Sequence, residues 1–440
     1  MKKAKGIVKE EIINDIISMI IQGTLNEGDL LPSIRSMSTR YNVSRGTILV
    51  VYKQLESIGY IQGFERSGYV VLRQDKPLSS ATVIYHEETR LLPLSQPVEQ
   101  LARFMERKPC RLPVHFIKRW VRNYEKNHNQ RNVTSSASYL PRFLKLSRRL
   151  EISDQSLLLL PGYQEALTLV ALFLKQETQC NTVLIEQPCD TIIRRLFIQF
   201  NFQVIDILVD ENGLMVEDLP TIPFATLLCM PSLQYPTATQ LSHERKEKLH
   251  LWALHNQAII IEDDRFAMLS FGKNISPPLL SHSSELTIIY LTHLFEMIGT
   301  TYNLGLMVVP KHLSNAFYSL HSMTTSTPLP TNVYIVGDFL ASSYFMKYLT
   351  SLIEERQHKA ALAYNICTQH LSLEQLNFHE EAGFCYCSTG ESMIPDEFIN
   401  TFFFPIIDHN IPHQIYPNFI FPYAQLTITE LEKMITQLTN

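Results

Sequence analysis

The sequence predicts an α/β protein in which a small, mainly helical module precedes a large body of alternating strands and helices. Apolar residues recur at helical spacing near the N-terminus, and short apolar runs of strand length alternate with helical stretches from about residue 101. A chain of 440 residues also exceeds what one hydrophobic core usually supports. We therefore expect a module at residues 1–73, a linker at 74–100, where Pro, Ser and charges mix, and a body at 101–440.

Composition excludes several classes of protein. The chain is 45% hydrophobic and 18% charged, which is ordinary for a globular protein. It has no uncharged apolar run of the length that a membrane span needs. Glu10, Glu11 and Asp15 interrupt the apolar residues near the N-terminus, unlike a secretory signal. We expect a cytoplasmic protein without a membrane partner.

The cysteines do not indicate a metal site. They are odd in number and scattered, and most lie in apolar surroundings, where cysteine behaves as a small buried hydrophobe. Cys385 and Cys387 are too close together for half of a usual CxxC zinc pair. We expect no bound metal. The seven cysteines are Cys110, Cys180, Cys189, Cys229, Cys367, Cys385 and Cys387.

The N-terminal module has the pattern of three helices and a hairpin. Ile12, Ile16 and Ile20 share one face of a first helix. Ser33 can cap a second helix, and Ser44 can cap a third after a short turn. Two helices joined in this way form a helix-turn-helix, and the second of them reads the major groove of DNA. Apolar runs on both sides of a turn near residue 66 predict a two-stranded wing.

The expected DNA contacts lie at the start of the second and third helices and in the wing. Arg45 can bind guanine O6 and N7, and Thr47 can meet a phosphate or a thymine methyl. Residues 1–75 hold 10 Lys and Arg against 8 Asp and Glu, a net charge of +2 in a chain of −5. The alternative is that these arginines are only solvated surface charges. The expected contacts are Arg35, Ser44, Arg45, Gly46, Thr47, Arg66, Ser67 and Gly68.

These residues also resemble a known family. The segment LPSIRSMSTRYNVSRGTILVVYKQLESIGYI, followed by RSGYVV, resembles the winged helix of GntR-type regulators, and its SRGT and YKQLESIGY parts are similar to the MocR subfamily. The resemblance implies a double-stranded DNA operator. It also implies a homodimer, because members of the subfamily dimerise through their bodies.

The sequence of the body predicts a mostly parallel sheet covered by helices, because strand-like runs alternate with helical stretches such as residues 242–256. No P-loop or GxGxxG motif is present. The clearest strands are expected at residues 183–185, 203–208, 226–230, 258–261, 287–291 and 305–309.

Small motifs along the body resemble, in order, the fold-type I aminotransferase domain that MocR regulators carry. This resemblance implies a three-layer α/β/α domain with a small C-terminal α+β subdomain at about 330–440. The motifs are PGYQEAL (161–167), IEQPCD (185–190), VDENGLMVEDL (209–219), PSLQYPTA (231–238), IIEDDRF (260–266) and YLTHLFEMIGTTYNLGLMVVP (290–310).

The resemblance places several changed residues at the positions that carry its pyridoxal phosphate chemistry. Glu296 stands where the family has the lysine that forms the internal aldimine, and a carboxylate cannot form a Schiff base. Asn303 replaces a phosphate-binding arginine, and Asp190 and Arg265 replace two tyrosines. Ile420 stands where an arginine grips the substrate carboxylate.

Some residues that the resemblance implies for the cofactor site are retained, and we call them the vestigial set. Asp263 matches the carboxylate that pairs with the pyridine nitrogen, although a carboxylate at a strand end can equally be held by nearby backbone. Lys273 and Lys311 are the nearest lysines in sequence, and either would need a rearranged loop to serve. We therefore expect no catalytic residue and no cofactor, with pyridoxal phosphate unlikely. The vestigial residues are Gly162, Tyr163, Gln164, Tyr235 and Asp263.

These inferences predict a sequence-specific DNA-binding regulator that is not an enzyme. Its catalytically inactive aminotransferase-like body would serve dimerisation and the sensing of an unidentified small effector. One alternative is a MocR-type regulator that binds pyridoxal phosphate, or an aminotransferase-like enzyme that uses a non-standard lysine. Another is an interaction protein whose winged helix contacts protein.

Overall fold

The fold is described from a computed structural model, in which the chain divides into two compact units, residues 1–90 and 91–440. Each unit is described by itself. The residues described are 9, 12–13, 15–16, 19–20, 24–26, 28–57, 61–64, 68–71, 111–127, 137–153, 156–270, 275–281, 285–299, 301–324, 330–371, 373–389, 394–395, 398–399, 401–406 and 418–439.

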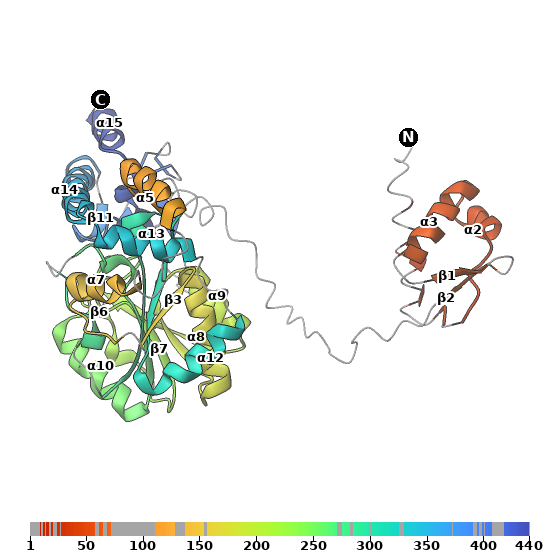
Figure 1. The fold of residues 1–440 in the computed structure, drawn as a ribbon, viewed down its shortest axis with the longest axis horizontal. Helices are drawn as coiled ribbons and strands as arrows, with labels where there is room; N and C mark the ends of the chain where they lie inside the picture. Colours follow the sequence, from red (N-terminus) through yellow and green to blue (C-terminus); the bar gives the residue numbers. More distant parts are fainter. Residues whose placement is uncertain are drawn as a thin grey trace. The chain divides into compact units, whose positions relative to one another are not determined.

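The N-terminal unit is a winged helix-turn-helix. The described residues between 9 and 20 are helical, and helices α2 (Ile34–Arg40) and α3 (Arg45–Ser57) follow. Strands β1 (Ile61–Phe64) and β2 (Gly68–Val71) pair in antiparallel fashion and form the wing (Figure 1). The predicted order of helices and wing is confirmed, and the predicted linker at 74–100 lies outside the described residues.

One small hydrophobic core holds this unit together. Ile16, Ile48 and Val51 are fully buried in it, so that the first helix packs on α3. The Tyr52 hydroxyl donates a hydrogen bond to the Pro32 carbonyl at 2.6 Å, which ties α3 to the segment that leads into α2. The periodicity that predicts the helices is therefore the periodicity of their buried face.

The body contains an eight-stranded mixed sheet with the order β3-β10-β9-β8-β7-β4-β5-β6. Its five central strands are parallel, while β10 runs antiparallel to both β3 and β9. All six predicted strands are present. The strands are β3 (Leu157–Leu160), β4 (Thr182–Gln187), β5 (Gln203–Asp210), β6 (Gly213–Leu214), β7 (Thr226–Cys229), β8 (Ile259–Asp263), β9 (Thr287–His293) and β10 (Gly305–Val308).

Helices cover both faces of this sheet (Figure 1). On one face, α8 and α12 pack together through Phe173 and Phe317, whose rings stack with centroids 4.3 Å apart. On the other face, Leu249 and Ala253 of α10 are buried against the sheet. Ser242 caps α10 by accepting a hydrogen bond from the Arg245 amide. The helices are α5 (Val114–Asn127), α7 (Tyr139–Arg148), α8 (Tyr163–Glu177), α9 (Thr191–Gln199), α10 (His243–Asn256), α11 (Phe295–Ile298), α12 (Ser314–Thr324) and α13 (Pro330–Ala341).

The C-terminal part is a smaller α+β layer with its own core. Four antiparallel strands in the order β11-β12-β14-β13 pack against two helices, and the stacked rings of Phe403 and Phe421 lie in this core. No helix in the described part of the chain is long and apolar enough to cross a membrane. The elements are α14 (Tyr344–Asn365), β11 (Leu373–Phe378), β12 (Cys385–Thr389), β13 (Phe404–Ile406), β14 (Asn418–Phe421) and α15 (Ile428–Thr439).

Candidate functional site

The candidate nucleic-acid interface is the exposed first turn of α3. Ser44 precedes the helix, and its hydroxyl oxygen accepts a hydrogen bond from the Thr47 amide at 3.1 Å. The same oxygen lies 2.8 Å from the Thr47 hydroxyl, so both side chains are held at the helix start. Arg45 and Gly46 are exposed beside them. This arrangement presents a free guanidinium at the end of the helix that enters the major groove in helix-turn-helix proteins.

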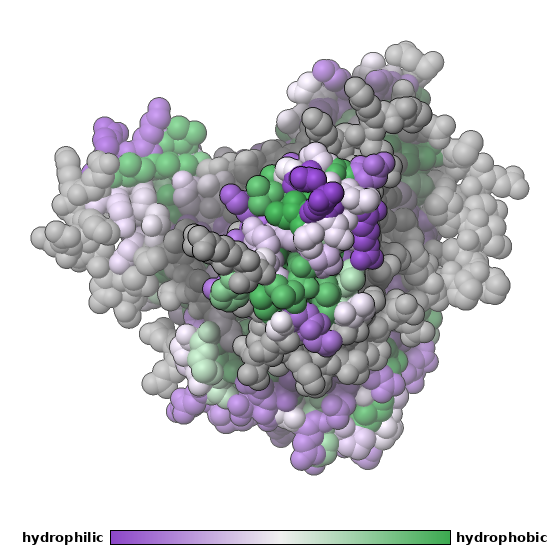
Figure 2. All heavy atoms as spheres, turned by 90° about the vertical axis from the view of Figure 1, so that its right-hand side faces the viewer, coloured by the Kyte–Doolittle hydropathy of each residue, from purple (hydrophilic) through white to green (hydrophobic). Residues whose placement is uncertain are grey.

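The other predicted contacts surround this turn. Arg35 is exposed in the first turn of α2, and Gly68 begins the second wing strand with a positive φ of 97°. Arg66 and Ser67 lie outside the described residues. The exposed side chains of the unit also include Leu49, Val50 and Phe64. Figure 2 looks on to this unit and shows hydrophobic and strongly hydrophilic residues next to each other.

The second candidate site is centred on Asp263, at the end of β8 in the middle of the large sheet. Its side chain is 1% exposed, and burial raises its pKa although Arg265 and Tyr163 act in the opposite direction. The Tyr163 hydroxyl donates to Asp263 Oδ2 at 2.6 Å. Arg265 Nε lies 3.1 Å from Oδ1 and 3.0 Å from Oδ2. Both carboxylate oxygens are therefore engaged by side chains of the protein itself.

Arg265 lies between an aromatic ring and two carboxylates. Its guanidinium carbon is 3.5 Å from the centroid of the Tyr163 ring, and Nη1 is 3.6 Å from Asp190 Oδ2. Asp190 also caps α9, because its Oδ1 accepts a hydrogen bond from the Ile192 amide. Burial alone would lower the pKa of Arg265, but Asp263 raises it, and the net shift is upward.

A glycine pair brings α8 and β10 together beside this cluster. A Cβ at Gly305 would lie 2.8 Å from the Gly162 carbonyl oxygen, so only glycine allows this approach. A Cβ at Gly162 would lie 2.8 Å from Glu165 Oε2 and 3.1 Å from Asn303 Nδ2. The glycine turn of the PGYQEAL motif is therefore covered by a carboxylate and a neutral amide.

Glu296 is buried in the short helix α11, with 3% of its surface exposed. Its Oε2 pairs with Nη2 of Arg356 from α14 at 3.2 Å, and its backbone oxygen accepts a hydrogen bond from Arg111. The same Arg356 nitrogen donates to the Ala382 carbonyl at 2.9 Å. The ion pair joins the large sheet region to the C-terminal layer at the position where the resemblance implies a lysine.

Aromatic side chains line the other side of the cluster. Tyr235 stacks on Phe266 with centroids 4.8 Å apart, and both meet Phe384 edge to face. Ile420 belongs to the same buried group, which is apolar where a carboxylate-binding arginine would be needed. Three members of the vestigial set, Gly162, Tyr163 and Asp263, are thus buried near one another, and the half-buried Tyr235 packs beside them.

Some of the residues considered do not join this cluster. The Gln164 side chain is exposed on α8, although it is one of the vestigial set. Lys311 is exposed in a turn after β10, and Lys273 lies outside the described residues. His293 contacts the edge of the Tyr163 ring, and burial lowers its pKa to about 3, so it is neutral at physiological pH. No group of three or more His, Cys, Asp or Glu in the described ranges could hold a metal ion.

A buried network that the sequence analysis missed supports the segment after β8. Arg148, the last residue of α7, pairs with Asp264 through Nε at 2.6 Å and Nη2 at 3.1 Å. Its nitrogens also donate to Ser232 and Ser270, and Tyr290 donates to Asp264 at 2.6 Å. The sequence offered one signal for this network: the second aspartate of IIEDDRF, for which the sequence analysis names no partner.

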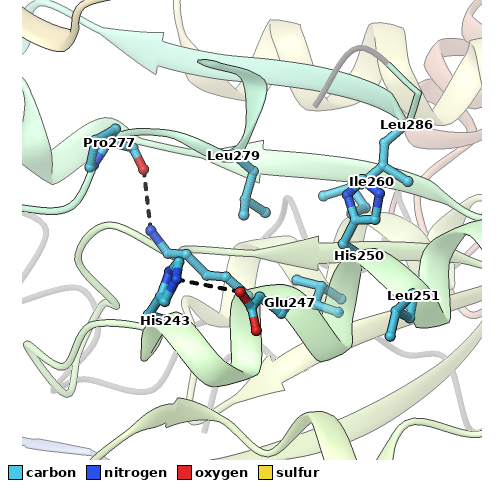
Figure 3. A pocket seen from close by; sticks show the side chains of 10 residues that line it. His243, Glu247, His250, Leu251, Ile260, Pro277, Leu279 and Leu286 are labelled. Carbon is cyan, nitrogen blue, oxygen red and sulfur yellow. Dashed lines mark hydrogen bonds and ion pairs between the residues drawn. The ribbon is translucent and has the colours of Figure 1, made fainter. Parts of the chain in front are cut away.

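A separate cavity of about 430 Å³ lies beside α10 and contains none of the predicted site residues (Figure 3). Leu249, Ile260 and Leu279 are among its lining, which is mainly apolar. At its rim His243 faces Glu247 at 3.5 Å. Lys246 is held by the Pro277 carbonyl and the Ser276 hydroxyl. A cavity of this size can hold a small apolar molecule.

Comparisons with known proteins agree with both units. Residues 8–71 match the family described as bacterial regulatory proteins, gntR family. The pyridoxine biosynthesis transcriptional regulator PdxR of Corynebacterium glutamicum is 24% identical, over 81% of this chain and 78% of its own length. The probable rhizopine catabolism regulatory protein MocR of Rhizobium meliloti is 22% identical, over 80% and 76%.

The body also resembles solved structures. The kynurenine aminotransferase of Pyrococcus horikoshii superposes with a TM-score of 0.64 at 14% identity, covering 79% of this chain and 93% of that one. A winged helix-turn-helix joined to an aminotransferase-like body defines a DNA-binding transcriptional regulator. Within that class, residues 8–71 match the GntR family, and the chain is similar over most of its length to the MocR and PdxR regulators.

The comparisons overturn one prediction. The sequence analysis expects no cofactor, but the kynurenine aminotransferase that shares this fold was solved in complex with PMP, the amino form of pyridoxal phosphate. The expectation of no cofactor is therefore wrong as stated, because this fold provides a place for such a group. It relied on the loss of the lysine, and a lysine is needed for covalent attachment rather than for every mode of binding.

In the arrangement described here, the residues do not fit that group in its covalent form. Glu296 offers no amine, and the Asp263 oxygens already have partners. Asn303 supplies no positive charge, and its Oδ1 is buried without a hydrogen-bond partner. A ligand of this kind would have to bind without an imine and after the side chains around Asp263 move.

Proposed function

We propose that this regulator reads its operator through α3, with Arg45 as the principal base-contacting residue. The observation that carries the proposal is the exposed Arg45 in a helix start fixed by Ser44 and Thr47. We expect further contacts to the DNA backbone or the minor groove from Arg35, Arg66, Ser67 and Gly68. Since operator DNA lies in the cytoplasm, the protein would act there.

The test begins with the genomic DNA fragments that the full-length protein retains. On such a fragment, Arg45→Ala should lose roughly 1–3 kcal/mol of binding free energy, because a bidentate arginine–guanine contact is removed. Lys53→Ala is the matched control, since Lys53 is an exposed cation further along the same helix. The change to Arg45 should also lower discrimination against mismatched sites, and Lys53→Ala should not. Equal affinity for the parent, Arg45→Ala and Lys53→Ala would contradict the assignment.

We further propose that the body serves dimerisation and the sensing of a small ligand, and does not catalyse amino transfer. One winged helix buries too little surface on DNA for tight specific binding, and two copies on two half-sites bury enough. Glu296 supports the non-enzymatic assignment, because it pairs with Arg356 and carries no amine. Conversion of amino acids to keto acids by the purified protein with added pyridoxal phosphate would refute it.

The ligand that we favour belongs to the vitamin B6 class. The relative PdxR is named as a regulator of pyridoxine biosynthesis, and the body has the fold of an aminotransferase solved with PMP. The Asp263 cluster is the favoured place, because its counterpart in the resemblance pairs with a pyridine nitrogen.

A further inference from the structure

An apolar pair, Leu49 and Val50, lies on the exposed face of α3. The Leu49 side chain is 38% exposed and that of Val50 is 44% exposed. The opposite face of the helix is fully buried in the core of the unit through Ile48, Val51 and Leu55. The pair therefore does not help to fill this core, and its place on the helix needs another explanation.

The pair continues the helix face that begins at Gly46. Residues at i, i+3 and i+4 are neighbours on a helix surface, so Gly46, Leu49 and Val50 form one patch. A Cβ at Gly46 would lie 3.7 Å from Ser44 Oγ, which is an ordinary contact, and the φ of Gly46 is not positive. Within the described part of the unit, neither packing nor backbone conformation thus requires glycine, which is unfavourable in a helix relative to alanine. The missing side chain leaves room for a partner to approach the helix closely.

The charges around this patch indicate the kind of partner. Arg45 precedes the patch and Lys53 follows it by one turn, and both are exposed. The first acidic residue of α3 is Glu56, whose carboxylate accepts a hydrogen bond from the Gly63 amide at 2.8 Å and so is directed to the wing. An apolar patch between two cations fits the major groove of DNA, where thymine methyl groups lie between two anionic phosphate backbones.

We propose that Leu49 and Val50 read thymine in the operator through its 5-methyl group, beside the guanine that Arg45 contacts. Among the four bases of DNA, only thymine carries a methyl group on its major-groove edge. Cytosine at the same place would present an amino donor, and neither leucine nor valine can accept its hydrogen bond. This role of the pair rests on the proposed function of α3 and deepens it, because it names a second base in the operator.

The experiment replaces single thymines by deoxyuridine in a genomic fragment that the full-length protein retains. Deoxyuridine pairs with adenine as thymine does and lacks only the 5-methyl group. At the thymines that the pair contacts, each replacement should weaken binding by about fourfold, which corresponds to the loss of one buried methyl group. Fluorescence anisotropy at fixed salt gives the affinities.

Leu49→Ala combined with Val50→Ala is the deciding variant. It should bind the unmodified fragment at least about fourfold more weakly than the parent, and replacement of the same thymines should weaken it no further. Lys53→Ala is the matched control, because Lys53 is a cation on the same exposed face, and this variant should keep the full effect of each replacement. All three side chains are exposed, so circular dichroism and thermal melting should match those of the parent.

Unchanged affinity of the parent after replacement of every thymine would overturn this role of the pair and leave the proposed role of Arg45 intact. An effect of replacement that persists in the double variant would also overturn it, because the effect would then arise from the shape of the DNA. Unchanged affinity of the double variant for the unmodified fragment would show that the pair faces a partner other than DNA. A parent that retains no genomic fragment would overturn the proposed function itself, and this role with it.

Discussion

Glu186 lies in the fully buried strand β4, and its Oε2 has no hydrogen-bond partner. Burial raises the pKa of its carboxyl from 4.5 to about 8, with a smaller contribution from the negative charge of Asp263. At neutral pH the group is therefore mostly protonated in the folded chain and ionised in the unfolded chain. The folded state binds the extra proton, so stability is lost as the pH rises from 4.5 toward 8.

Glu186→Gln should remove this loss, because the amide is neutral at every pH. At pH 8.5 we expect the variant to be more stable than the parent by up to about 5 kcal/mol, since one pKa unit corresponds to 1.36 kcal/mol. At pH 5 the parent and the variant should unfold at the same temperature. Glu262 has its pKa raised to about 7 by burial and will leave part of the pH dependence in place.

Thermal or urea unfolding at several pH values measures this effect. Glu177→Gln is the control, because Glu177 is exposed at the end of α8 and its substitution should change neither midpoint. A Glu186→Gln protein that loses stability with rising pH as steeply as the parent would show that Glu186 is ionised in the fold.

The sequence shows which residue types stand at the site, but it does not show which side chains they bind. The motif order places Glu296 and Arg265 at chemically decisive positions. However, Arg356 pairs with Glu296 from 60 residues away, and Tyr163 reaches Asp263 from 100 residues away. Tyr163 is predicted only as a member of the vestigial set, and the sequence does not indicate that its hydroxyl binds Asp263. Contacts over such separations depend on how β8, α8 and α14 are packed, and a single sequence contains no signal for that.

For secondary structure, the sequence predicts a strand most clearly where an apolar run is buried and has a clear beginning and end. The runs at β4, β7, β8 and β9 are continuous and apolar, which is typical of parallel strands covered on both faces. The short edge strands β3 and β6 are not among the strands predicted most clearly. Four leucines in β3 lack alternation, and β6 has only two residues, so neither has a period that distinguishes it from helix or turn.

The Arg148 network allows a prediction about how α7 is attached to the sheet. Arg148→Met should destabilise the body by about 3–5 kcal/mol, because the buried Asp264 keeps its charge and retains Tyr290 as its remaining side-chain donor. Arg148→Met combined with Asp264→Asn should recover part of the loss, since the uncompensated charge is removed.

Chemical denaturation monitored by circular dichroism provides the measurement. Arg149→Met is the neighbouring control, because Arg149 is exposed at the end of the same helix, and its effect should stay within about 0.5 kcal/mol. A loss below about 1 kcal/mol for Arg148→Met would mean that the network contributes little to holding the helix.

The two units of the chain differ in how directly their residues indicate a function. The winged helix is small, and its function can be proposed from residues exposed on one helix. The body retains an aminotransferase fold while its central carboxylate is bound by its own tyrosine and arginine.

The proposed dimer leads to a prediction about the operator. If two winged helices are held by one dimeric body, binding of the second half-site is intramolecular, and its loss should weaken binding by about 10²–10⁴-fold. We expect this loss when one half-site of a retained genomic fragment is replaced by unrelated sequence of equal length, measured by fluorescence anisotropy at fixed salt. Sedimentation of the free protein should give the mass of two chains. A single half-site bound within threefold of the full operator would show that each winged helix acts alone, whatever the oligomeric state of the body.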